Sequence, residues 1–142
     1  MKYRRIYLDN CCFNRPFDNQ EQLKIRLETE AKLFIQQSVL LGTYELVWSY
    51  ILEFENNQNP YADRRNAIRD WKDVATVFCV ENESIIEFAE NLSSLGIKVK
   101  DALHIACAVD ANADCFITTD KKLLNTNVKE IKIINPLMFI NE

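Results

Sequence analysis

Histidine is almost absent from this sequence of 142 residues, in which His104 is the single example. A metal-free ribonuclease mechanism that needs two histidines is therefore excluded. A zinc site of the finger type is disfavoured as well, because the 5 cysteines form no CxxC pair. Glycine (2) and proline (3) are scarce, which argues against long linkers or disorder. The apolar run near the N-terminus is too short for a signal peptide and no run could span a bilayer, so we expect a cytoplasmic protein with reduced thiols and no membrane segment.

Positive charge is also in short supply. The formal net charge is −4 and the isoelectric point is about 5.1. A polyanionic partner would therefore have to meet local basic patches or bound cations rather than a basic surface. The length predicts a single domain over residues 1–142, with enough chain to bury a core.

Strand and helix signals alternate along the chain. Asn19 with Gln22 and Ser84 with Glu87 have the spacing of capping boxes, and Pro60 suits a first helical position. Strands are predicted at 5–8, 44–48, 75–80, 115–118 and 131–134. Helices are predicted from the cap Asn19 to about 41, from Ser49, at 60–71, at 85–95, from Asp101 and at 120–124. This alternation predicts a three-layer α/β sandwich with a central parallel sheet, while spacing alone leaves the strand order open.

Four acidic residues stand at positions that could form one site. Asp9 and Asp120 follow predicted strands, Asp101 opens a helix, and Glu53 lies four residues after the predicted cap Ser49. Singly, each could be a turn residue, a helix cap or a solvated side chain. In an open parallel sheet, however, ligands collect beyond the carboxyl ends of the strands, where Asp9 and Asp120 would meet.

Clustered carboxylates repel one another unless a cation or a proton lies among them. Oxygen ligands suit Mg²⁺ and Mn²⁺, and such ions can activate water and stabilise a phosphodiester during in-line attack. The residues therefore point to metal-dependent chemistry on a phosphodiester.

Four segments of the chain resemble, in order, the four motifs of the PIN domain family: Ile6-Tyr-Leu-Asp9-Asn, Ser49-Tyr-Ile-Leu-Glu53, Lys100-Asp101-Ala-Leu-His-Ile-Ala106 and Phe116-Ile-Thr-Thr-Asp120. The resemblance implies a sheet of strand order 3-2-1-4-5 and Mg²⁺- or Mn²⁺-dependent cleavage of single-stranded RNA. Many stand-alone members resemble VapC toxins that an antitoxin protein silences. A homodimer is expected on the same ground.

The resemblance also assigns roles to residues. Asp9, Glu53, Asp101 and Asp120 would form the acidic quartet that binds metal and positions water. Thr118 or Thr119 would orient the last acid, and Asn10 would line the site.

Side chains outside the quartet are interpreted from their position in the sequence. Arg15, on the loop after Asp9, is the preferred phosphate contact, followed by Lys121 and Lys122. His104 is interpreted as a packing or surface residue. Two acids close to the quartet in sequence, Glu55 and Asp114, could support the quartet from outside it or be solvated, and the solvated interpretation is preferred. A basic cluster could guide RNA or be a solvated helix face: Arg64, Arg65, Arg69 and Lys72.

Three other kinds of function compete with a nuclease. A phosphatase of the haloacid dehalogenase kind needs a second aspartate two residues after the first, where this chain has Cys11. A response-regulator receiver is disfavoured because it needs acids clustered at the first strand and a lysine after the fifth. A non-catalytic RNA- or protein-binding module with a PIN-like fold would not need the complete quartet.

Overall fold

A computed structural model describes residues 3–142 and contains a fully parallel sheet. Its strands are β1 (Arg5–Leu8), β2 (Glu45–Ser49), β3 (Val77–Cys79), β4 (Cys115–Ile117) and β5 (Lys132–Ile134). Their order across the sheet is β3-β2-β1-β4-β5, which confirms the order that the resemblance implied.

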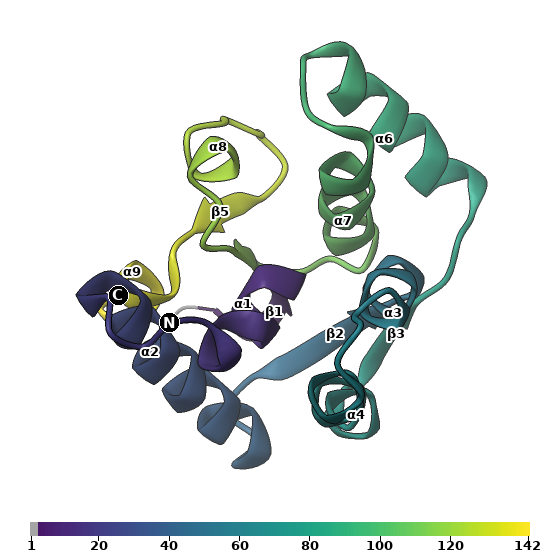
Figure 1. The fold of residues 1–142 in the computed structure, drawn as a ribbon. Coiled ribbons are helices and arrows are strands. Elements are labelled where there is room, and N and C mark those ends of the chain that lie inside the picture. The colour runs from purple at the N-terminus through teal and green to yellow at the C-terminus, as the bar shows by residue number, and fades with distance from the viewer. Residues whose placement is uncertain (1–2) are drawn as a thin grey trace.

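Helices cover both faces of this sheet (Figure 1). They are α1 (Asn10–Asn14), α2 (Leu23–Leu40), α3 (Tyr50–Asn57), α4 (Ala62–Arg69), α5 (Trp71–Val74), α6 (Glu83–Ser94), α7 (Val99–Asp110), α8 (Lys121–Leu124) and α9 (Pro136–Ile140), with a short 3-10 turn, η1 (Arg15–Phe17). Helix α7 packs against β2 and β4 with α6 outside it, while α2 and α9 lie together on the opposite face. The predicted three-layer arrangement is confirmed.

Strand β1 is the centre of the sheet. Ile6 pairs with Leu46 of β2 on one side and with Cys115 of β4 on the other. The side chains of Ile6, Tyr7 and Leu8 are fully buried. Such a strand, covered on both faces, shows a continuous apolar run rather than an alternating one. Its carboxyl end therefore delivers Asp9 to the middle of the sheet's edge.

Several predicted helix boundaries were wrong, each for a local reason. Helix α2 begins at Leu23, and Asn19 instead accepts a hydrogen bond from the backbone of Glu21 in a turn. Helix α6 begins one residue before Ser84, because the side chain of Asn82 caps it through Ile85 N. The predicted helix at 60–71 is two short helices, α4 and α5.

Two short helices that follow strands, α1 after β1 and α9 after β5, were not predicted from the sequence. Helix α1 begins directly after Asp9, which accepts a hydrogen bond from Asn10 N as its cap. Pro136 does end the fifth strand, but it then occupies the first turn of α9 behind the cap Asn135. Within residues 3–142, no helix has both the length and the apolar character that a membrane span requires.

Candidate active site

Asp9 lies at the carboxyl end of β1 and is only 6% exposed. Its Oδ1 accepts a hydrogen bond from Asn10 N at 2.8 Å, and its Oδ2 accepts one from Thr118 Oγ1 at 2.9 Å. The second bond joins the ends of β1 and β4, the two central strands. The buried carboxylate is thus held in one orientation by Asn10 and Thr118, which come just after β1 and β4.

Asp101 and Asp120 lie beside it. Asp101 is in the first turn of α7, and Asp120 caps α8 by accepting a hydrogen bond from Lys122 N at 2.9 Å. Burial and the negative charges of Asp9 and Asp120 raise the pKa of Asp101 above its ordinary value. Burial is the larger cause, and the two neighbouring carboxylates add to it because like charges disfavour the ionised form.

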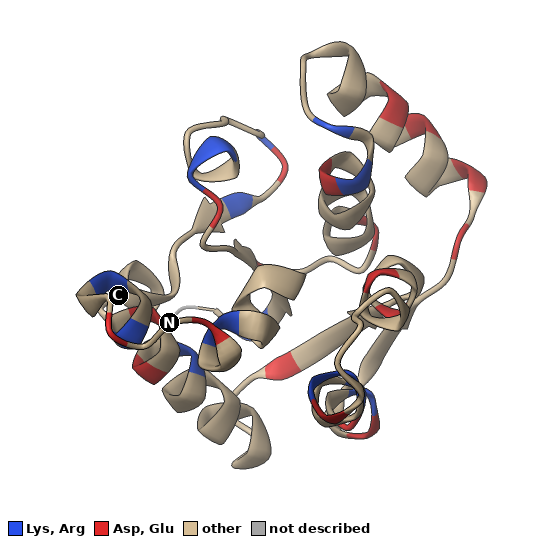
Figure 2. Cartoon of the chain, viewed as in Figure 1, with Lys and Arg blue, Asp and Glu red and all other residues tan. Residues whose placement is uncertain are grey.

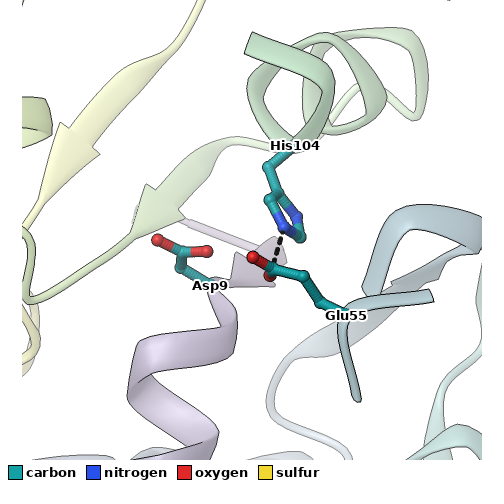
Figure 3. Close-up of side chains that lie close together, drawn as sticks. All are labelled: Asp9, Glu55 and His104. Carbon is teal, nitrogen blue, oxygen red and sulfur yellow. Dashed lines mark hydrogen bonds and ion pairs between the residues drawn. The ribbon is translucent and has the colours of Figure 1, made fainter. Parts of the chain in front are cut away.

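Glu55 completes this cluster together with His104 (Figure 3). Oε1 of Glu55, on α3, lies 2.7 Å from Nε2 of His104, on α7. The hydrogen bond to His104 and the charge of that ring outweigh the effect of burial and lower the pKa of Glu55. Burial would lower the pKa of His104, but the bond to Glu55 and the nearby acids outweigh it and raise that pKa. Both changes favour an ionised Glu55.

A chain of hydrogen bonds fixes the ring of His104 from behind. Its Nδ1 lies 2.6 Å from the hydroxyl of Tyr7, which lies 2.6 Å from Ser49 Oγ. An ionised carboxylate only accepts hydrogen bonds, so Nε2 carries the proton that it donates to Glu55. In the neutral ring, Tyr7 then donates to Nδ1. Tyr7 and His104 are almost completely buried, and this chain holds Glu55 toward Asp9.

Glu53, the expected member of the quartet, is not brought to this cluster. Its Oε1 accepts a hydrogen bond from Trp48 Nε1 at 3.0 Å and lies 3.4 Å from Lys72 Nζ. Residues two apart in a helix lie on nearly opposite faces, so Glu53 and Glu55 cannot both face Asp9. Ile51 and Leu52 are buried, and Glu55 follows them at four and three residues on the same face. That helical spacing is the signal that could have selected Glu55 from the sequence.

Other expected site residues have well-defined structural contacts. Arg15 donates to the buried Glu28 at 2.8 Å and to Asp18 at 2.9 Å, so its guanidinium is already paired. Thr118 or Thr119 was expected to orient the carboxylate of Asp120, but the hydroxyl of Thr118 donates to Asp9. The same Oγ1 accepts a hydrogen bond from Asp120 N at 3.1 Å.

The remaining predictions near the site have mixed outcomes. The side chain of Thr119 is buried, and its backbone N–H points to the sulfur of Cys11 at 3.4 Å. Asn10 begins α1 next to Asp9, and its buried Oδ1 has no hydrogen-bond partner among the described residues. Asp114 lies at the opposite end of β4, where it accepts hydrogen bonds from Arg4 N and Arg5 N.

This donor set fits a divalent cation. One ligand atom each from Asp9, Glu55 and His104 lie within 4.8 Å of one another, and Asp101 and Asp120 adjoin them. Carboxylate oxygens suit Mg²⁺ and Mn²⁺. Because Nε2 of His104 already faces Glu55, the imidazole is placed to orient a carboxylate ligand, which is a common arrangement around metal sites.

Comparison with solved structures finds the same fold. The crystal structure of FitAcB from Neisseria gonorrhoeae matches with a TM-score of 0.58 and 14% identity over 93% of this chain and 98% of that one. VapBC2 from Rickettsia felis, bound to a DNA fragment from its promoter, matches with a TM-score of 0.60 and 12% identity over 92% and 98%. Comparison with curated protein sequences gives no match. The family model of the PIN domain matches residues 6–129, so this chain belongs to the PIN domain family.

Proposed function

We propose that this protein is a metal-dependent endoribonuclease that cleaves single-stranded RNA with Mg²⁺ or Mn²⁺. The observation that carries the proposal is the cluster of Asp9, Glu55, Asp101 and Asp120 at the carboxyl ends of the central strands. PIN domains are generally metal-dependent nucleases, which supports the same reaction here. A divalent cation held by these acids would supply charge stabilisation for the phosphodiester and activate water for in-line attack.

The residues of this chain divide the remaining work. The cation would be bound by the four acids Asp9, Glu55, Asp101 and Asp120. Without it, these carboxylates would repel the phosphate of the substrate. Thr118 fixes the orientation of Asp9, and His104 fixes that of Glu55. Glu53 is outside the cluster and has no role in this proposal. Arg15 is assigned to the fold rather than to an RNA phosphate because Glu28 and Asp18 hold it.

We further propose that the protein acts as the toxin of a toxin–antitoxin pair. The similar structures from Neisseria gonorrhoeae and Rickettsia felis are named FitAcB and VapBC2, and the resemblance to VapC toxins implies an antitoxin partner. A homodimer and a cytoplasmic location belong to the same proposal. The test of this role is whether expression of the chain arrests growth, and whether the product of a neighbouring small gene restores it.

The test of the chemistry is cleavage of single-stranded RNA by the purified protein, free of antitoxin, in Mn²⁺ or Mg²⁺. Cleavage should require the cation, stop in EDTA, and be lost in Asp9→Asn and Asp101→Asn. Cleavage that persists in both variants would reject the site. Failure to cut several unrelated RNAs, with retained RNA binding, would favour the non-catalytic module.

A further inference from the structure

Two adjoining pockets lead away from the acidic cluster. The nearer one, of about 170 Å³, is lined by Asp101 and Asp120 and lies between the α6–α7 turn and α8. The second, of about 340 Å³, continues along the loop between α8 and β5. Leu95, Ile97 and Thr126 line both pockets, so together they form one groove that begins at the acids.

Three lysines without an ion pair among the described residues line this groove. Lys98 and Lys122 lie in the nearer pocket and Lys129 in the second, and all three side chains are exposed. As far as residues 3–142 are concerned, none of the three forms an ion pair, whereas Lys72 and Lys100 are paired with acids of α3. Figure 2 shows basic segments in blue on α8 and at the start of α7.

The groove also has an apolar wall. Leu95 is 79% exposed at the end of α6, and it lines both pockets. Ile97 and Leu92 extend the apolar surface behind it, and Glu130 contributes one carboxylate at the far end. Single-stranded nucleic acid is bound by this combination, in which cations follow the phosphates and apolar surface meets the faces of the bases.

We propose that this groove holds the single-stranded RNA next to the phosphate that is cleaved, with backbone phosphates at Lys98 and Lys122 and a base against Leu95. The proposal rests on the nuclease function proposed above and adds the path of the substrate. Two observations select RNA as the occupant: the free lysines complement phosphate, and the groove is continuous with the acidic site. An acidic peptide would also meet the lysines, so the test includes one.

The first measurement is equilibrium binding of a fluorescein-labelled oligouridylate of about ten nucleotides, in EDTA so that no cleavage occurs. The double variant Lys98→Ala/Lys122→Ala should bind about 10-fold more weakly at low salt. Its plot of log affinity against log salt should lose about 1.4 of its slope, because each phosphate contact on a single strand contributes about 0.7. Lys24→Ala/Arg26→Ala, which removes two cations from α2, is the control and should bind like the wild type.

Leu95→Asp tests the apolar wall and has a close match elsewhere in the chain. Leu41 is 73% exposed, follows α2 and precedes Gly42, as Leu95 follows α6 and precedes Gly96. Leu95→Asp should weaken oligouridylate binding several-fold, and Leu41→Asp should not. Equal affinities for the wild type and all these variants, or stronger competition by a poly-aspartate peptide than by unlabelled oligouridylate, would overturn the proposal.

Cleavage kinetics separate this proposal from the proposed function. If the protein cuts RNA, the double lysine variant should raise KM about 10-fold and leave kcat nearly unchanged. If no RNA is cut, the nuclease function fails, yet weaker oligouridylate binding by the groove variants still supports the groove. Normal KM together with normal binding in those variants would overturn the groove and leave the nuclease function intact.

Discussion

Nε2 of His104 lies 2.7 Å from Oε1 of Glu55, although the two residues are 49 positions apart in sequence and lie on different helices. This bond makes the single histidine of the chain a positioning residue for an acid of the site. Tyr7 supports the ring on its other side. The imidazole, although buried, is therefore fully partnered.

Replacing His104 should loosen Glu55 without removing it. We expect His104→Gln to lower the affinity for Mn²⁺ and the cleavage rate by about 10- to 100-fold, the range seen when the partner of a metal ligand is lost. Excess Mn²⁺ should restore part of the rate. Titration of activity with Mn²⁺ measures both effects. A variant with wild-type Mn²⁺ dependence would show that Glu55 needs no support from the ring.

Glu53 and Glu55 offer a matched pair on one helix. Glu55→Gln should abolish most cleavage because it removes a charged oxygen ligand, while Glu53→Gln should retain cleavage. The latter variant keeps the acceptor for Trp48 and loses only partly exposed ion pairs with Lys72 and Arg69. Its free energy of unfolding should change by less than about 1 kcal/mol. Loss of cleavage in Glu53→Gln with retained cleavage in Glu55→Gln would show that Glu53, and not Glu55, is the acid of the site.

Asp101→Asn should stabilise the metal-free protein. The raised pKa of Asp101 means that folding disfavours its ionised form, so stability in EDTA falls as the pH rises from about 3.8 through the raised value. At neutral pH the amide removes that repulsion, and the melting temperature in EDTA should rise by about 2–4 °C. Adding Mn²⁺ should raise the melting temperature of the wild type more than that of the variant. A lower melting temperature in EDTA would contradict the clustering of the acids.

Arg15→Ala should unfold the protein more readily rather than weaken RNA binding alone. Glu28 is fully buried, and its two oxygens are held by Arg15 and by Asn135 Nδ2 at 2.8 Å each. Removing one partner of a buried pair typically costs about 3–5 kcal/mol because a charge is left uncompensated. Denaturant unfolding measures this loss, and Arg15→Ala/Glu28→Gln should recover part of it. Unchanged stability with weaker RNA binding would favour the phosphate contact.

Lys32 gives a prediction that is independent of the acidic site. Burial lowers the pKa of Lys32 from 10.5 to about 8, although its ammonium lies 5.8 Å from the centre of the Phe13 ring. The unfolded chain binds more protons between these values, so stability should rise with pH across pH 8 to 10.5. Lys32→Met should flatten this rise and stabilise the protein at pH 7 by about 1–3 kcal/mol. Calorimetry at several pH values provides the measurement.

The sheet and most of its strands could be predicted because they follow from short-range pattern. The buried runs 5–8 and 115–118 are each followed within two residues by an aspartate, and the parallel arrangement then places Asp9 and Asp120 on one edge. Helix starts were less predictable, because Asn82 and Ser84 are both good caps and only the observed backbone decides between them.

The site was only partly predictable for a similar reason. Sequence places Glu53 and Glu55 in the same helix. The one sequence signal that separates them is the helical spacing of Glu55 from the apolar residues Ile51 and Leu52, whose burial sets the rotation of the helix. The role of His104 depends on Tyr7, 97 positions away, and the pairing of Arg15 depends on Glu28 in another helix. These contacts join residues that are far apart in sequence, so no local sequence pattern predicts them.

The central place of β1 has a consequence for folding. The hydroxyl that orients Asp9 belongs to Thr118, 109 positions further along the chain. Strand β1 must pair with β4 before that hydrogen bond can form, and sheets built from such distant partners assemble slowly. The acidic site therefore cannot be complete in a chain whose central strands have not yet paired, so its formation marks a late stage of folding.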